Sequence, residues 1–183
     1  KSQHRGGKGV SGITTKEEDS VEHILTTTTH TELFFFTSTG RVFRLKTWEI
    51  PQASRTAKGQ AIVNLLQLKP DERITAMFPV EKDNKATKYY FMATTGGTVK
   101  KTAIEDFANV RTSGLIAIKL KEKEQLAWVE PTTGKDHLML VTAQGQSVMF
   151  AESDVRPMGR ASQGVRGIKL KGEDRVVQLL KIP

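Results

Sequence analysis

Short apolar runs recur along the chain, and each one leads through a glycine-containing turn into a second short segment of apolar or alternating residues. The runs occupy residues 33–36, 89–92 and 138–141, and the turns that follow contain Gly40, Gly97 and Gly145. A strand, a tight turn with glycine and a returning strand are typical of a β-hairpin. The pattern therefore predicts three hairpins.

Two further patterns alternate with these hairpins. In the first, an arginine is followed within a few residues by a glycine and then by an apolar segment, at residues 5–13, 55–63, 111–118 and 160–168. The shared glycine indicates a turn that needs positive φ or close packing. In the second, acidic residues precede an apolar strand that begins near Val21, Ile74, Leu126 or Val176.

The three patterns together repeat with a period of about 50 residues, which is the length of a four-stranded propeller blade. The segments are too short and too rich in Thr, Val and Ile for helical repeats. We predict an all-β fold, a propeller-like array of four-stranded blades with about three and a half repeats. The chain is expected to form one domain, residues 1–183, with approximate units at 1–32, 33–88, 89–137 and 138–183. Trp48 and Trp128 are expected in the core, and the polar stretch 81–88 in a loop.

The charge of the chain indicates which class of molecule it binds. The 183-residue chain has a formal net charge of +8 and a sequence pI near 9.7. Such a surface attracts polyanions, of which nucleic acid is the commonest. The chain has no cysteine, which excludes disulfides, thiolate metal sites and cysteine nucleophiles. Because no apolar run approaches the roughly 20 residues of a spanning helix, we expect a soluble cytoplasmic protein without membrane contact.

Basic side chains gather at two places in each unit, whereas acidic side chains gather before the last strand. The basic positions are Arg41, Arg44, Lys46, Lys100 and Lys101 after the hairpin turns, and Arg5, Lys8, Arg55, Lys58, Arg111, Arg160 and Arg166 around the arginine–glycine turns. If equivalent turns of stacked units share one border, these cations form a stripe that neutralises successive phosphates of a DNA duplex. Two other interpretations are solvated outer faces of amphipathic strands and a scaffold whose basic border binds an acidic protein.

The first arginine–glycine turn differs from the other three. It reads QHRGGKG at residues 3–9 and places Gly6 and Gly7 between Arg5 and Lys8. Consecutive glycines let backbone N–H groups approach a phosphate, and the flanking cations supply charge. The segment is therefore a candidate phosphate contact.

This segment resembles the motif QRRGGKG, known as the GyrA box, and longer segments resemble the C-terminal domain of the DNA gyrase A subunit. Those segments are KEEDSVEHI (16–24), GRVFRLKTWEIPQASRTAKG (40–59), GTVKKTAIEDFANVR (97–111) and FAESDVRPMGRASQGVRGIKL (150–170). The resemblance covers essentially the whole chain. It implies a β-pinwheel, a propeller relative usually of six blades, whose basic border bends and wraps DNA and so supports negative supercoiling.

The resemblance also implies partners and contacts. The partners would be double-stranded DNA, the remaining domains of the gyrase A subunit, and the gyrase B subunit. The DNA contact would include the box residues Gln3, His4, Arg5, Gly6, Gly7, Lys8 and Gly9. His4 stands where the family pattern has arginine. Because histidine is mostly neutral near pH 7, we expect weaker binding of DNA by the box. Val148 and Met149 occupy the positions of Lys100 and Lys101, so the stripe is expected to thin there.

No catalytic residue, metal or cofactor is expected in this chain. It has no Walker-type phosphate loop, and its four histidines lack ligand spacing. The family places its catalytic tyrosine in another domain, so the resemblance implies a non-catalytic part of an ATP-dependent type II DNA topoisomerase. Topoisomerase IV is the alternative within the family, and the nearly intact box favours gyrase.

Overall fold

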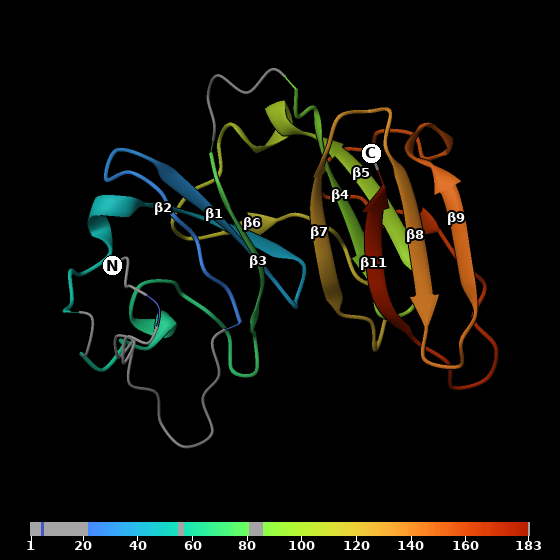
Figure 1. The fold of residues 1–183 in the computed structure, drawn as a ribbon, viewed down its shortest axis with the longest axis horizontal. Coiled ribbons are helices and arrows are strands. Elements are labelled where there is room, and N and C mark those ends of the chain that lie inside the picture. The colour runs from blue at the N-terminus through green and yellow to red at the C-terminus, as the bar shows by residue number, and fades with distance from the viewer. Residues whose placement is uncertain (1–4, 6–21, 55–56, 81–85, 183) are drawn as a thin grey trace.

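The structure is a computed structural model that describes residues 5, 22–54, 57–80 and 86–182. In this part of the chain, strands form three antiparallel sheets that stand side by side (Figure 1). The first sheet has the order β3 (Ile74–Pro79), β1 (Glu32–Thr37), β2 (Arg41–Lys46) and β6 (Leu115–Ile116). The second has the order β10 (Val165–Arg166), β5 (Thr98–Ala103), β4 (Tyr89–Thr94) and β7 (Leu126–Thr132). The third has the order β11 (Val176–Ile182), β8 (His137–Thr142) and β9 (Ser147–Ala151).

The described helices are single 3₁₀ turns: η1 (Thr47–Glu49), η2 (Ile62–Asn64), η3 (Ile104–Phe107) and η4 (Glu152–Asp154). None of the helices in the described ranges is long and apolar enough to cross a membrane. The all-β prediction is confirmed, as are the three hairpins β1–β2, β4–β5 and β8–β9. The strands expected after the acidic turns are β3, β7 and β11, whereas Val21 lies outside the described residues.

The first strand of the first hairpin is apolar on both faces because it lies between two layers of core. In β1, Phe34 and Phe36 pack toward the second sheet with Tyr90, while Leu33 and Phe35 pack on the opposite face. Successive side chains of a strand point to opposite faces, so a strand buried on both sides reads as a continuous apolar run. This explains why the run at residues 33–36 does not alternate.

The outer strand of each four-stranded sheet comes from the next repeat. The short strand β6 follows the arginine–glycine turn at 111–114 and pairs with β2, joining Val42 to Leu115. In the same register, β10 follows the turn at 160–164 and pairs with β5, joining Val99 to Val165. The sheets in space are therefore out of phase with the repeats in the sequence.

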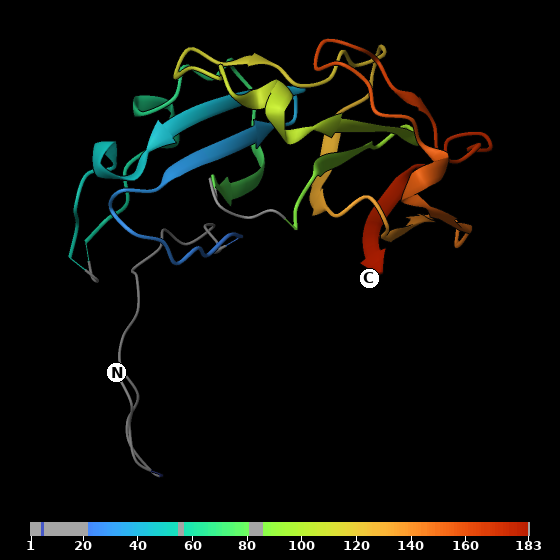
Figure 2. The same cartoon turned by 90° about the horizontal axis from the view of Figure 1, so that it is seen from above.

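These exchanged strands form the outside of the array. The last strand of each sheet at the other edge, β3, β7 or β11, contacts its neighbour in the next sheet, so these strands lie toward the common centre. Figure 2 shows the segments with β6 and β10 along one side of the row of sheets, with β3, β7 and β11 toward the other. We call the segments 111–118 and 160–168 the outer border.

The structure corrects two expectations about single residues. Trp48 is 55% exposed because it lies in η1 beyond the end of β2, whereas Trp128 packs against the core between the second and third sheets as expected. Gly114 and Gly164 have φ of 80° and 92°, as the arginine–glycine pattern predicts. Gly59 has neither a positive φ nor any atom within 4 Å of an added Cβ, since no hairpin of the described chain lies beneath it.

Candidate nucleic-acid interface

Each arginine–glycine turn of the outer border lies on the hairpin of the preceding repeat. A Cβ added to Gly114 would lie 2.7 Å from Cε1 of Phe43, and one added to Gly164 would lie 2.5 Å from the carbonyl oxygen of Val99. Only glycine permits this approach together with a positive φ. The two turns therefore occupy equivalent places on successive sheets, as the expected common border requires.

Exposed cations lie on this border and elsewhere on the described part of the chain. Arg111 begins the first turn, and Arg166 lies on β10; both are exposed. Arg5, Lys46 and Lys58 are also exposed, and the Lys46 ammonium lies 4.9 Å from the centre of the Trp48 ring. These five side chains are accessible to a phosphate that approaches from solvent.

Three of the expected contact arginines are half-buried, and each donates to a backbone carbonyl of the border or of residues 106–108 just before it. Arg41 donates from Nη2 to the carbonyls of Ser113 and Gln67, at 3.3 Å each. Arg44 donates from Nη1 to Ala108, and its Nη2 forms an ion pair with Glu32. These guanidinium groups hold the border in place as well as contributing positive charge.

Arg160 acts in the same way from within the second turn of the border. Its Nη1 donates to the carbonyl of Ile116 at 3.1 Å, and its Nε donates to the carbonyl of Asp106 at 3.3 Å. Because Ile116 lies on β6, Arg160 joins one border segment to the next.

The expectation that Lys100 and Lys101 lie exposed on the border is wrong. Both are buried, Lys100 completely and Lys101 with 4% exposure. Lys100 donates to three backbone carbonyls, while Lys101 donates to the carbonyl of Glu152 and lies 4.7 Å from the centre of the Tyr89 ring. Lys101 occupies the position of Arg44 in the repeat and Lys100 that of Phe43, but the segments whose carbonyls bind the two lysines remove them from solvent.

The acidic turns bind the hairpin turns of the same repeat. The buried carboxylate of Glu72 accepts hydrogen bonds from the hydroxyls of Thr37 and Thr39. Glu124 accepts from Thr94 and Thr98 at 3.1 and 3.0 Å. Asp174 accepts from the backbone N–H of Gln144, in the third hairpin turn. Acidic side chains therefore gather before the last strand of each of these repeats because they bind the hairpin turn of the same repeat.

The pKa of Glu72 shows that its hydrogen bonds and ion pair outweigh the effect of its burial. Burial favours its neutral form, but hydrogen bonds from Thr37, Thr39 and the N–H of Lys69, with the charge of Arg41, lower the pKa below the usual 4.5. The carboxylate is thus ionised throughout the neutral range, and Arg41 forms an ion pair with it at 3.2 Å.

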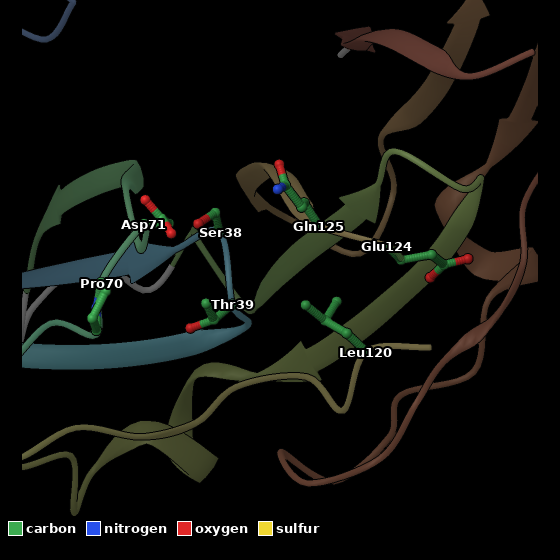
Figure 3. A pocket seen from close by; sticks show the side chains of 7 residues that line it. All are labelled: Ser38, Thr39, Pro70, Asp71, Leu120, Glu124 and Gln125. Carbon is green, nitrogen blue, oxygen red and sulfur yellow. The ribbon is translucent and has the colours of Figure 1, made fainter. Parts of the chain in front are cut away.

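A hollow lies beside these acidic turns, between the repeats 33–88 and 89–137. It has a volume of about 300 Å³ and is lined by Ser38, Thr39, Pro70, Asp71, Leu120, Glu124 and Gln125 (Figure 3). Two of the lining side chains are carboxylates and none is a cation, so the hollow repels phosphate. A polyanion is therefore favoured at the outer border and not here.

Two exposed lysines of the border region were missed by the sequence analysis. Lys119 and Lys169 directly follow the ends of the two border segments, and the backbone N–H of Lys119 donates to Ser162 in the second turn. The signal that could have found them is the tetrapeptide IKLK, which occurs at 118–121 and again at 168–171.

Most of the box lies outside the described residues. Gln3, His4, Gly6, Gly7, Lys8 and Gly9, together with Arg55, belong to the ranges that the structure does not describe. Their contact with DNA stays a prediction from the sequence.

Comparison with known proteins gives a consistent result. Residues 1–28, 31–81, 88–133 and 136–183 match the family described as DNA gyrase C-terminal domain, beta-propeller. The DNA gyrase A subunit of Klebsiella oxytoca is 48% identical over 178 residues, covering 97% of this chain and 20% of the relative. The DNA gyrase A subunit of Mycolicibacterium smegmatis is 43% identical over 181 residues, covering 98% of this chain and 21% of the relative. The chain thus spans about a fifth of the curated relatives it matches.

Solved structures show the same architecture. The crystal structure of the C-terminal domain of DNA topoisomerase IV has a TM-score of 0.84 and 32% identity, and the match covers 93% of this chain and 53% of that chain. The structure of a DNA gyrase A C-terminal domain has a TM-score of 0.65 and 28% identity, and the match covers 85% of this chain and 49% of that chain. With the family match over most of its length, the chain belongs to the DNA gyrase C-terminal domain family of β-propellers.

Proposed function

We propose that this chain binds and wraps double-stranded DNA along its outer border, without catalysing a reaction itself, and so supports negative supercoiling by a DNA gyrase. The observation that carries the proposal is that the turns of Arg111 and Arg160 occupy equivalent places on the outer edges of successive sheets. A curved row of cations neutralises successive phosphates and bends the duplex along it. The contacts are to phosphate, so little sequence preference is expected.

The proposed contact set joins exposed and half-buried cations. The exposed members are Arg5, Lys46, Lys58, Arg111 and Arg166, with Lys119 and Lys169 added from the structure. The half-buried members are Arg41, Arg44 and Arg160, and the box residues 3–9 and Arg55 complete the set from the sequence. Lys100 and Lys101 are removed from it.

The proposed partners beyond DNA are the other domains of a gyrase A subunit and, through them, the gyrase B subunit. Gyrase is favoured over topoisomerase IV because the full-length relatives of 43–48% identity named above are gyrase proteins and because the box differs from QRRGGKG at His4 alone. The fold does not separate the two enzymes, since a topoisomerase IV domain has the higher TM-score of the two structures compared. The proposed place of action is the cytoplasm.

A salt titration of DNA binding tests the proposal. The affinity of the unmodified chain should fall steeply with salt, by about 0.9 log units per log unit of salt for each phosphate neutralised. Substituting Arg111→Ala and Arg166→Ala together should reduce that slope by about 2. Arg175→Ala, an exposed arginine in an acidic turn, is the matched control and should leave the slope unchanged.

Two outcomes reject the proposal. Affinity for DNA that does not depend on salt would favour the scaffold that binds an acidic protein. A slope reduced by about 1 in the Arg175→Ala control, the loss per charge expected at the border, would show that the charge acts from anywhere on the surface and not from the border.

The contribution of the box is tested separately by wrapping. Substituting Arg5→Ala and Lys8→Ala together should abolish the linking difference of a nicked plasmid that is bound and then ligated, while circular dichroism shows an unchanged β fold. A linking difference equal to that of the unmodified chain would reject the assignment of the box.

A further inference from the structure

The ammonium of Lys100 is completely buried and has every donor satisfied. It donates to the carbonyl oxygens of Ala117 at 2.8 Å, Ser162 at 3.2 Å and Arg160. An ammonium carries three N–H donors and no acceptor, so three carbonyls match it fully. A buried charge without such partners would be strongly destabilising.

The three acceptors belong to two different segments of the outer border. Ala117 directly follows β6, which pairs with the first sheet, whereas Arg160 and Ser162 lie in the turn that precedes β10, which pairs with the second sheet. Lys100 itself lies on β5 of the second sheet. One side chain therefore joins two successive border segments at the place where they approach each other.

The first hairpin reaches a similar arrangement with other residues. Phe43 occupies the third position after its turn glycine, as Lys100 does after Gly97, and packs against Gly114. The polar link is made by Arg41, whose Nη2 joins Ser113 of the next turn to Gln67 of its own repeat. At both junctions a cation of the hairpin binds the carbonyl of the serine in the following turn.

We propose that Lys100 is a positioning residue of the DNA-binding border: by binding Ala117 together with Arg160 and Ser162, it fixes the spacing between the two arginine–glycine turns. This inference rests on the proposed function, because the spacing of the turns sets the path of the bound duplex. Lys100 does not itself neutralise a phosphate, since it has no exposed surface. Its loss should therefore disturb wrapping without changing the number of phosphate contacts.

Lys100→Met, in the full chain, tests this proposal. Methionine keeps most of the buried stem and removes the donors. We expect amide hydrogen exchange at 115–118 and 160–168 to become about tenfold faster as these segments lose their shared anchor. The linking difference of ligated plasmid should fall at least to about half, while the salt slope of DNA affinity stays within about 0.3 of the unmodified value.

Lys101→Met is the matched control, because Lys101 is the neighbouring buried lysine and binds Glu152 outside the border. It should leave exchange at 115–118 and the linking difference unchanged. If Lys100→Met does not fold, Lys100→Phe takes its place, since Phe43 fills the equivalent position of the first hairpin. The same losses are expected of it.

The outcomes separate this inference from the function on which it rests. Exchange at 115–118 and 160–168 that is unchanged in the Lys100 variant, or a linking difference that is unchanged, overturns the positioning role. A salt slope reduced by about 1 also overturns it, because Lys100 would then be a phosphate contact. If the unmodified chain itself produces no linking difference, the proposed function fails and exchange alone reports whether Lys100 joins the segments.

Discussion

The ring of Phe43 lies directly beneath Gly114, so that a Cβ on this glycine would meet Cε1 of the ring at 2.7 Å. Phe43 belongs to the first hairpin and Gly114 to the next repeat. This contact joins two repeats and supports the first turn of the outer border. The contribution of this contact to stability can be measured separately from the cost of placing a side chain at a positive φ.

Gly114→Ala should destabilise the chain by about 3 kcal/mol, because alanine disfavours positive φ and also clashes with a buried ring. Gly145→Ala is the matched control, with a φ of 82° and no atom within 4 Å of the added Cβ. It should cost about 1 kcal/mol, the backbone part alone. Urea unfolding of both variants measures the difference. Equal losses would show that the Phe43 contact contributes nothing.

Replacing the carboxylate of Glu72 should lower the stability of the folded chain at neutral pH and make that stability depend less on pH in the acid range. Glu72→Gln should lower the free energy of unfolding at pH 7 by about 1–3 kcal/mol, since Gln cannot accept from Thr37, Thr39 and Lys69 as the carboxylate does. Because the pKa of Glu72 is lowered by folding, its contribution is complete above pH 4.5 and is lost as the pH falls through the lowered pKa.

Chemical unfolding at pH 7 and at about pH 3.5 checks the sign of this effect. The gap between the Glu72→Gln variant and the unmodified chain should narrow at the lower pH. Glu122→Gln, at an exposed acid of the next acidic turn, should change stability little at either pH. A gap that widens in acid would contradict the account of Glu72.

The buried Lys100 should make stability rise with pH in the alkaline range. Burial, followed by the charge of Arg160, lowers the pKa of Lys100 to about 8, whereas Asp106 acts in the opposite direction. Between pH 8 and 10.5 the folded chain binds fewer protons at this site than the unfolded chain, so stability increases with pH. Between about pH 7.5 and 9.5 the unmodified chain should gain roughly 2 kcal/mol relative to Lys100→Met. Parallel curves for the two proteins would refute this.

The lysines of the repeated tetrapeptide IKLK should contribute to DNA binding. Substituting Lys119→Ala and Lys169→Ala together should reduce the salt slope of DNA affinity by about 2, because both exposed lysines flank the border. Lys135→Ala, an exposed lysine in the turn between β7 and β8, should have no effect on the slope. Fluorescence anisotropy at several salt concentrations provides the measurement. A slope equal to that of the unmodified chain would remove both lysines from the contact set.

Local patterns were sufficient for the hairpins and for the position of the turns. The apolar run at 33–36 and the glycine at 40 predict β1 and β2 because strand pairing across a tight turn is a local event. The pattern of arginine followed by glycine likewise predicts the positive φ of Gly114 and Gly164. Gly59 shares the sequence pattern without the conformation, because the conformation also requires a hairpin beneath the turn.

Exposure of the basic side chains could not be read from the same patterns. Arg44 and Lys101 occupy equivalent positions of the repeat, yet Arg44 is half-buried and Lys101 is 4% exposed. The sequence pattern repeats in every blade, but equivalent side chains contact different residues of the neighbouring sheet. A lysine can bury its stem and satisfy its ammonium with carbonyls where the opposing backbone supplies them.

The amino-acid sequence by itself determined the repeated strands, the positions of the turns and the sorting of charge, because these depend on residues close together in the chain. Only the tertiary structure decided that β6 and β10 pair with the preceding repeat and that Lys100 joins two border segments. The contacts of Lys100 alone link residues up to 62 positions apart. They depend on which backbone carbonyls the packed sheets bring to one point, and that information is absent from any single stretch of sequence.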